Sequence, residues 1–272
     1  MRKRITLRFA LFAVACIVML SSVSAQNTQK AHNASAANSA QEIMLNVYNR
    51  PQPKDMSALL TMTLIDSKGR ERTRSLKQLS ADYGSTEKKI MQFQSPADVR
   101  GTSFMNWSYA ETGKSDDQWI YLPALKRVKR ISSDGRGDSF MGSDFSYDDL
   151  AERHPDEDSH TILGSETVNG EECWVIESVP KDKAYSYSRV VSWVSKNKLL
   201  GFRRDFYDKG EKLLKTLSIH KAEEISGFIM ITHTEMHNVQ KNHRTTMEFT
   251  SLELDKGIQE SSFTERSMMK AL

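Results

Sequence analysis

The amino-acid sequence predicts a mainly β (α+β) protein built on one strongly curved antiparallel sheet of about eleven strands. Apolar and polar residues alternate in successive short runs between Leu59 and Leu254, which is the pattern of half-buried strands. Short turn segments separate the runs, and connections of that length join antiparallel neighbours. No linker and no fixed-period repeat divides these runs, so a single domain is expected over residues 39–272.

A targeting signal precedes this domain. Several basic residues lie within the first eight positions, an apolar run extends from Phe9 to Leu20, and Val23-Ser-Ala25 is a small-residue cleavage site. We therefore expect residues 1–25 to be a signal peptide that is cleaved after Ala25. A retained membrane anchor is the alternative, although the apolar run is short compared with the roughly 20 residues of a span.

Cleavage would change the charge of the protein. The whole chain carries +3, with 38 basic and 35 acidic residues, but the signal contains four of the basic residues and no acidic one. The remaining 34 basic and 35 acidic residues give a net charge of −1, which argues against a nucleic-acid partner. Cys173 is then the only cysteine, so no internal disulfide is expected.

A helix is expected at the start of the domain. Residues 26–38 are rich in Ala, Ser and Asn without a periodic pattern, and they predict a flexible leader. Ser39 and Glu42 have the spacing of a capping box. Apolar residues then share one helical face up to Tyr48, and Pro51 ends the helix.

The first half of the predicted sheet begins at Leu59, where Leu60, Met62 and Leu64 alternate with polar residues. Ser67-Lys-Gly69 provides the turn that follows. The next expected strands are Arg70–Ser80, Lys88–Gln94, Thr102–Tyr109, Gln118–Leu122 and Lys126–Ile131.

A long polar segment rich in Gly, Ser and Asp interrupts the strands after Ile131. It contains the apolar residues Phe140 and Met141, and Ser146 and Asp149 have helix-start spacing. A short helix is therefore predicted from Tyr147 to Arg153. Apolar residues inside a loop of this length suggest a mobile flap, Ser132–Asp149.

The second half of the predicted sheet contains the clearest hairpin signal, Asn169-Gly170, between two β-rich runs. Ser262 and Glu265 repeat the capping-box spacing and predict a final helix with Met268 and Met269. The expected strands are His160–Val168, Glu172–Val179, Arg189–Val194, Leu200–Phe206, Lys212–Glu224, Phe228–His237 and Arg244–Leu254.

Several segments resemble one bacterial family. WIYLPAL, KRVKRI and SFMGSDFSYDDL lie between positions 119 and 150, and similar pieces include Ser95-Pro-Ala-Asp-Val-Arg-Gly-Thr102 and Phe206-Tyr-Asp-Lys-Gly210. They resemble the outer membrane lipoprotein-sorting family, which is related to the periplasmic carrier LolA. The resemblance implies a half-open β-barrel with a helical lid, a periplasmic location, and lipid or lipoprotein acyl chains as cargo. It also implies an inner-membrane RND-type transporter and an outer-membrane acceptor as partners.

A cavity of lipid size is expected because a sheet with more than eight strands encloses more space than its own side chains fill. Methionine suits such a cavity, since its flexible side chain adapts to changing apolar shapes. The flap would gate the cavity. Alternation does not reveal which face is concave, and the same residues could be ordinary core. The candidate ligand-binding residues are Met62, Met91, Met105, Trp119, Tyr121, Phe140, Met141, Trp193, Phe206 and Met230.

Motifs for catalysis are missing from the sequence, so we expect no enzyme, no cofactor and no metal site. His233 and His237 lie four residues apart in a predicted strand, which separates them by about 13 Å. Two ligands of one ion cannot be that far apart. The basic run Lys126–Arg130 could meet lipid headgroups, or it could be a solvated strand edge that resists aggregation.

The sequence is compatible with three functions. The leading interpretation is a periplasmic carrier that holds acyl chains in an apolar cavity and passes them towards the outer membrane. The first alternative is a non-enzymatic envelope scaffold whose cavity is filled by its own side chains. The second alternative is a hydrolase of envelope lipids, which would need a nucleophile paired with a base, and no motif here suggests that pair.

Overall fold

The computed structural model describes residues 40–111 and 113–272. The expected signal peptide, residues 1–25, and leader, residues 26–38, lie outside the described residues. A helix over residues 40–48 opens the described chain, close to the range predicted from the sequence. Within the described ranges, no helix is both long and apolar enough to cross a membrane.

All thirteen strands belong to one sheet, in the order β6-β5-β4-β3-β2-β1-β13-β12-β11-β10-β9-β8-β7. The first six strands are β1 (Asp55–Ile65), β2 (Glu71–Asp82), β3 (Thr86–Ser95), β4 (Ser103–Tyr109), β5 (Asp117–Leu122) and β6 (Arg127–Arg130). The other seven are β7 (Asp158–Val168), β8 (Glu171–Pro180), β9 (Arg189–Ser195), β10 (Gly201–Tyr207), β11 (Leu213–Ile225), β12 (Phe228–Asn238) and β13 (His243–Leu254).

Every neighbouring pair in the sheet is antiparallel, as predicted. The two halves of the chain meet where β1 pairs with β13, and the sheet ends at β6 and β7 without closing. The expected count of about eleven strands was too low, because all thirteen runs expected from the sequence form separate strands, down to the four residues of β6.

The predicted hairpin at Asn169-Gly170 is confirmed. Both residues have positive φ, 53° and 79°, which is the combination that a two-residue type I′ turn requires. Ser226-Gly227, between β11 and β12, repeats it with φ values of 54° and 85°. These tight turns keep consecutive strands in register.

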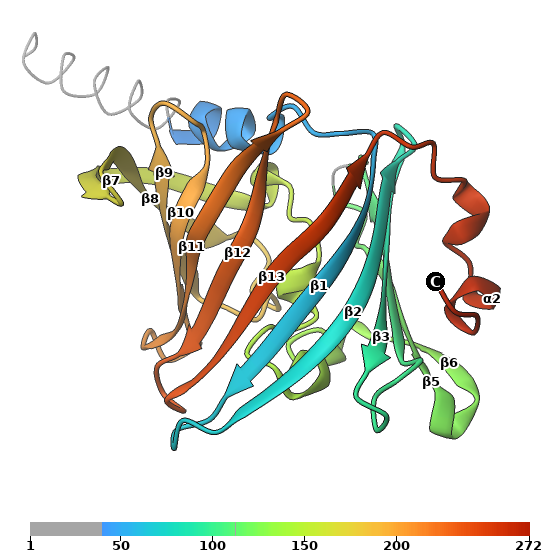
Figure 1. Cartoon of the computed structure of the whole chain (residues 1–272). Helices are drawn as coiled ribbons and strands as arrows, with labels where there is room; N and C mark the ends of the chain where they lie inside the picture. The colour runs from blue at the N-terminus through green and yellow to red at the C-terminus, as the bar shows by residue number, and fades with distance from the viewer. Residues whose placement is uncertain (1–39, 112) are drawn as a thin grey trace, which may run out of the picture.

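The sheet bends around the segment that connects β6 to β7, residues 131–157, which we call the inner segment (Figure 1). This cover is not the helical lid that was expected, because it consists of irregular backbone and single 3-10 turns: η2 (Ser133–Gly135), η3 (Phe140–Gly142), η4 (Asp148–Leu150) and η5 (Pro155–Glu157).

The helix predicted from Tyr147 to Arg153 is also wrong. The capping contacts do form, because the Ser146 amide donates to Asp149 and the Asp149 amide donates to the Ser146 hydroxyl, at 2.6 and 3.3 Å. Ala151 nevertheless returns to extended backbone, with ψ 161°. Pro155 follows too soon for a second helical turn, since proline disfavours helical backbone at the preceding residue.

The outer face of β3, β4 and β5 is covered by the C-terminal arm, residues 255–272 (Figure 1). The arm contains η6 (Glu260–Ser262) and α2 (Glu265–Met268), and Phe263 and Met268 are fully buried against Ile90 and Met105. The expected final helix exists, but Thr264 rather than Ser262 caps it, by accepting a hydrogen bond from the Ser267 amide.

Candidate functional site

The concave face of the sheet is lined by methionine, leucine and phenylalanine. Because alternate residues of a strand share a face, one set of positions from each strand gathers there. These buried residues pack in a single cluster: Leu60, Met62, Leu64, Leu76, Met91, Phe93, Phe104, Phe206, Met236 and Met247. The cluster is mainly flexible or flat side chains, which can adapt to different apolar contents.

Aromatic side chains of the inner segment occupy the middle of this face. Phe140 is 0% exposed, and its ring centroid lies 5.8 Å from Phe93 and 5.5 Å from Phe104. Tyr147 packs edge-on against Phe140 at 5.8 Å, and Phe145 is buried in the same cluster. In this conformation the protein fills its own concave face.

A buried ion pair fastens the inner segment to β11. Lys215 and Asp149 form a salt bridge in which their side chains are only 4% and 3% exposed. Asp149 also accepts a hydrogen bond of 2.8 Å from the Tyr187 hydroxyl and one of 2.6 Å from the Ser146 amide. The carboxylate therefore accepts from three donors, which compensates for the burial of its charge.

A second buried carboxylate, Asp144, fastens the segment to β13. Asp144 Oδ2 accepts a hydrogen bond of 2.7 Å from the Thr245 hydroxyl and lies 2.6 Å from His243 Nδ1. The Arg74 guanidinium donates to the carbonyl of Met141 at 2.6 Å, and the Gln118 amide donates to the carbonyl of Tyr147 at 2.9 Å. Strands β2, β5, β11 and β13 thus hold the inner segment through polar contacts as well as apolar packing.

A mouth pocket of about 740 Å³ opens at one end of the concave face. Its walls come from the end of the first helix, from β2, β3 and β4, and from the last residues of the inner segment, and Met230 reaches it from β12. Acidic residues dominate the wall near β3 and β4, where Glu87, Asp116 and Glu152 all contribute. The mouth is therefore polar, whereas the concave face behind it is apolar.

The carboxyl of Glu152 has an unusual pKa, raised to about 8. Desolvation by the pocket walls is the main cause, and the nearby Glu87 adds to it through its charge and a hydrogen bond. Desolvation also raises the pKa of Asp116, although hydrogen bonds from Ser108 and Asn106 oppose that rise. Glu152 holds a proton more readily than an ordinary surface carboxyl.

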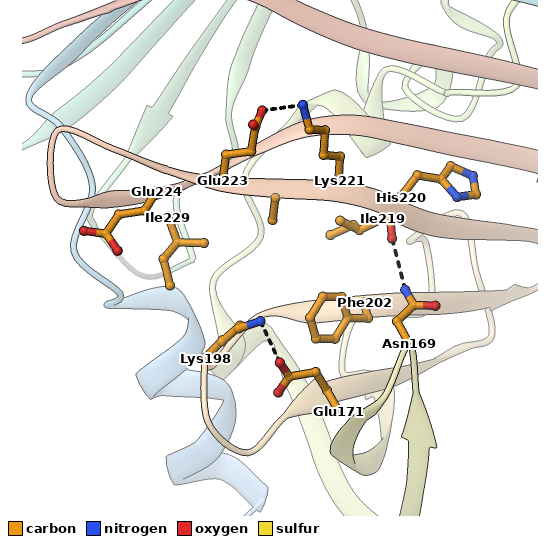
Figure 2. A pocket seen from close by; sticks show the side chains of 11 residues that line it. Asn169, Glu171, Lys198, Phe202, Ile219, His220, Lys221, Glu223, Glu224 and Ile229 are labelled. Atoms are coloured by element: carbon orange, nitrogen blue, oxygen red, sulfur yellow. Dashed lines mark hydrogen bonds and ion pairs between the residues drawn. The ribbon is translucent and has the colours of Figure 1, made fainter.

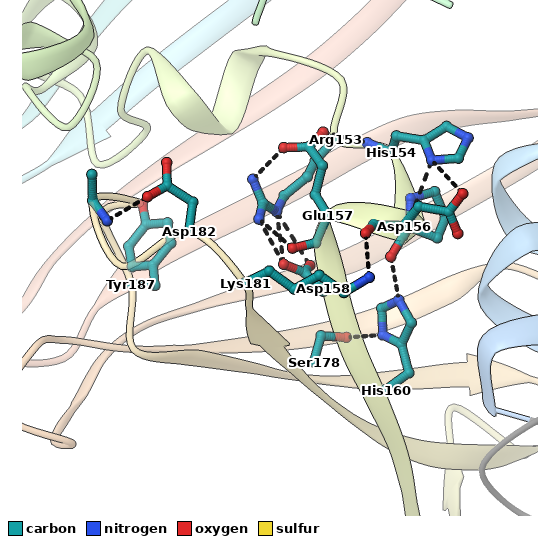
Figure 3. A network of polar contacts seen from close by, with 12 residues as sticks. Arg153, His154, Asp156, Glu157, Asp158, His160, Ser178, Lys181, Asp182 and Tyr187 are labelled. Atoms are coloured by element: carbon teal, nitrogen blue, oxygen red, sulfur yellow. Dashed lines mark hydrogen bonds and ion pairs between the residues drawn. The ribbon is translucent and has the colours of Figure 1, made fainter. Parts of the chain in front are cut away.

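The end of the inner segment is tied to β7 by a polar network (Figure 3). Arg153 donates to Glu157 at 2.8 Å and to Asp158 at 2.6 Å, and its guanidinium lies 3.9 Å from the centre of the Tyr185 ring. His160 contacts the Pro155 carbonyl and the Ser178 hydroxyl, at 2.9 and 2.8 Å. Burial lowers the pKa of His160, so the imidazole is held neutral as part of the structure.

A separate pocket of about 530 Å³ lies between the β7–β8, β9–β10 and β11–β12 turns (Figure 2). Phe202, Ile219 and Ile229 give it an apolar wall. Four of its charged residues form two ion pairs, with Lys198 2.6 Å from Glu171 and Lys221 2.9 Å from Glu223. Both lysines of the pocket are therefore already neutralised by carboxylates.

Five of the ten candidate ligand-binding residues meet at the concave face. Met62, Met91 and Phe206 belong to its cluster together with Phe140, and Met141 packs against it from the inner segment. A sixth, Met230, lines the mouth pocket. The structure thus places five of the predicted residues in or against the cluster of the concave face and the sixth in the mouth pocket.

The other four candidates lie elsewhere. Met105, Trp119 and Tyr121 belong to the cluster beneath the C-terminal arm, on the outer face. On β9, Val190 packs against the cluster of the concave face, whereas Trp193 belongs to a cluster on the opposite face. The Trp193 indole donates a hydrogen bond to Glu166 at 2.7 Å, and its ring lies 4.4 Å from the Arg203 guanidinium. Their side chains do not line the concave face in this conformation.

Sequence reasoning missed several residues of the site. Phe93 and Phe104 stand in predicted strands, but both faces of β3 and β4 are buried, so alternation alone does not assign them to the concave face. No local pattern marked Asp144, Asp149 and Lys215 as anchors of the segment, since the contacts that join them to the strands connect residues far apart in the sequence. Over the residues that the structure describes, no cluster of three or more His, Cys, Asp or Glu could hold a metal ion.

The chain is similar to proteins of one bacterial family. A family model described as an uncharacterized protein matches residues 85–270, and no curated protein matches. Two solved structures each share 32% identity and a TM-score of 0.81 over 86% of this chain. One is a DUF1329 family protein from Desulfovibrio piger, matched over 99% of its length, and the other is an outer membrane lipoprotein-sorting protein domain from Vibrio parahaemolyticus, matched over 100%.

A more distant structure shares the fold. A LolA superfamily protein from Nitrosomonas europaea has a TM-score of 0.64 at 19% identity, with 85% of this chain and 99% of that chain covered. The family resemblance seen in the sequence is confirmed by these matches. The chain belongs to the DUF1329 family, is similar over most of its length to an outer membrane lipoprotein-sorting protein domain, and shares its fold with a LolA superfamily protein.

Proposed function

We propose that this protein is a periplasmic carrier that holds the acyl chains of a lipid or lipoprotein on the concave face of its sheet. The observation that carries the proposal is the cluster of methionine and phenylalanine beneath the inner segment. The aromatic residues of that segment occupy the space that an acyl chain would take. Loading then requires the inner segment to move away from the sheet.

The energetics suit reversible loading. Burying one CH₂ group contributes about 0.8 kcal/mol, so a chain of roughly fifteen carbons contributes on the order of 10 kcal/mol before costs. Moving Phe140 and separating Lys215 from Asp149 would offset a large part of this gain. The net affinity is then modest enough for the cargo to be passed on.

The mouth pocket would hold the polar end of the cargo, because it joins a polar wall to the apolar face behind it. By family resemblance, the donor is an inner-membrane RND-type transporter and the acceptor lies at the outer membrane. Transfer of this kind makes and breaks no covalent bond, so we propose a non-catalytic protein.

A second candidate function is an envelope scaffold whose cavity is closed by its own side chains. The complete burial of Phe140 favours it, since the concave face is already filled without cargo. The scaffold predicts that the inner segment stays in place and that no lipid binds.

Native mass spectrometry with lipid extraction separates the two functions. Mature protein, residues 26–272, purified from a periplasm should contain stoichiometric lipid or take up added phospholipid or acylated peptide. Met62→Glu places a charge on the concave face and should abolish that lipid, whereas Trp119→Ala, under the C-terminal arm, should keep it. An empty protein that refuses both added ligands supports the scaffold.

A further inference from the structure

The β5–β6 hairpin stands at the free edge of the sheet (Figure 1). A 3-10 turn, η1 (Pro123–Leu125), joins the two strands, and the Lys126 amide donates to the Pro123 carbonyl at 3.0 Å. Leu125 ends this turn with 57% of its surface exposed, more than any other large apolar residue of the described chain. The tip of the hairpin therefore presents a leucine to solvent.

This exposure is fixed by the turn itself. Pro123 sets the backbone at the start of the turn, and Lys126 closes it in the left-handed region with φ 47°. The Pro123 ring also packs closely against the backbone of Gly101: a Cβ atom added to Gly101 would lie 3.3 Å from this ring. Within the described residues, Leu125 packs in none of the buried apolar clusters, neither on the concave face nor beneath the C-terminal arm nor elsewhere on the sheet. Folding alone gives no reason for a leucine at this position.

Positive charge surrounds the leucine. Lys126, Arg127, Lys129 and Arg130 are all exposed. The only carboxylate between positions 117 and 131 is Asp117, which pairs with Arg130. These fifteen residues therefore carry +3, whereas the chain after the expected signal carries −1. The positive charge of a nearly neutral protein is thus concentrated next to its most exposed leucine.

We propose that the β5–β6 tip docks the protein on the surface of an anionic phospholipid membrane. Leu125 would enter the boundary between headgroups and acyl chains, while Lys126, Arg127 and Lys129 meet the lipid phosphates. Surface binding of this kind combines buried apolar area with attraction between basic residues and anionic lipid. The site is separate from the concave face, so the inference does not depend on the proposed carrier function.

Vesicle flotation tests the proposal with mature protein, residues 26–272. Vesicles of phosphatidylethanolamine and phosphatidylglycerol should carry the protein at low salt, and vesicles of phosphatidylcholine alone should not. Raising the salt to about 1 M should release it, because the screening length falls to about 3 Å. Removing the leucine contact in Leu125→Ser should lower the partition coefficient about tenfold.

Two further variants sharpen the test. The double change Arg127→Glu and Lys129→Glu should lower the partition coefficient at least about tenfold, because it reverses two charges and leaves the Arg130–Asp117 pair intact. Leu163→Ser is the matched control, since Leu163 is 55% exposed on β7 at the opposite edge of the sheet. It should bind vesicles like the unchanged protein.

Equal binding to phosphatidylcholine vesicles would overturn the proposal, and so would Leu125→Ser behaving like the unchanged protein. A loss in Leu163→Ser as large as in Leu125→Ser would do the same. Urea unfolding of each variant verifies that the fold is intact. Leu125→Ser should still retain extractable lipid, so failure of membrane docking is distinguishable from failure of the carrier function.

Discussion

At the scale of single residues, the inner segment depends on a few buried polar contacts. Lys215 and Asp149 are almost completely buried, and the carboxylate is satisfied by Tyr187 and Ser146 as well. Such a pair contributes little net stability when whole, because its desolvation offsets its attraction. Breaking the pair is a different matter, since it leaves one uncompensated charge in an apolar surrounding.

The change Lys215→Met should therefore lower the free energy of unfolding by about 3–5 kcal/mol, because Asp149 remains buried without its cation. Urea unfolding at neutral pH measures this. Lys221→Met is the control, because the Lys221–Glu223 pair has side chains 60% and 44% exposed, and its loss should change stability by no more than about 0.5 kcal/mol. Similar losses for both variants would contradict the assignment of the buried pair.

A pH dependence follows from Glu152. Its pKa is raised to about 8 from the ordinary value of 4.5, so between these values the folded state binds more protons than the unfolded state. The contribution of Glu152 to the free energy of unfolding is therefore fully present below pH 4.5 and is lost as the pH rises to about 8. Solvent in the mouth pocket reaches the carboxyl and reduces the size of the effect.

Thermal unfolding between pH 5 and pH 8 tests this, because Glu152→Gln removes the titrating group. The melting temperature of the unchanged protein should fall more steeply across that interval than that of Glu152→Gln. Parallel slopes for the two proteins would show that Glu152 ionises normally. Glu265→Gln, on the C-terminal arm and far from the pocket in sequence, serves as the charge-matched control.

At the scale of the elements, tight turns and two covering segments shape the sheet. The inner segment fills the concave face, and the C-terminal arm covers the outer face of β3, β4 and β5. Neither is a long helix, so both depend on the strands for their conformation. The strands in turn depend on turns such as Asn169-Gly170 for their pairing.

Replacing Gly170 by alanine should destabilise the protein by about 1–2 kcal/mol, because its φ of 79° is costly for a residue with a Cβ. Chemical denaturation measures the loss. Gly164→Ala provides the comparison. Gly164 lies in β7, its φ is not positive, and no other atom lies within 4 Å of the position that a Cβ would take. It should change stability by less than about 0.5 kcal/mol. Equal losses of stability in the two variants would contradict the claim that the positive φ of Gly170 causes the destabilisation.

At the scale of the whole molecule, the sequence could predict the succession of strands along the chain but not which face of each strand is concave, nor that β1 pairs with β13. Alternation and turn residues identify each strand, because both signals are local. On β3 and β4 both faces are buried: Met91 and Phe104 under the inner segment, Ile90 and Met105 under the C-terminal arm. Odd-numbered and even-numbered positions of these strands are therefore both apolar, and the sequence gives no basis for deciding which set lies on the concave face.

The irregular backbone of the inner segment, found in place of a helical lid, could not be predicted from local sequence patterns either. The spacing of Ser146 and Asp149 is a true helix-start pattern, and its hydrogen bonds exist. Asp149 is also held by Lys215 and Tyr187, which lie 66 and 38 positions away in the sequence. Only tertiary packing decides that the segment leaves the helix after one turn and lies across the sheet.

The central claim is that an acyl chain replaces the inner segment on the concave face. Photolabelling with a phospholipid that carries a diazirine in its acyl chain, followed by peptide mapping, tests it most directly. Label should appear on Met62, Met236 and Met247, which face the inner segment, and be absent from Met105 and Trp119 beneath the C-terminal arm. Label confined to the outer face, or no label on a folded protein, would contradict the account.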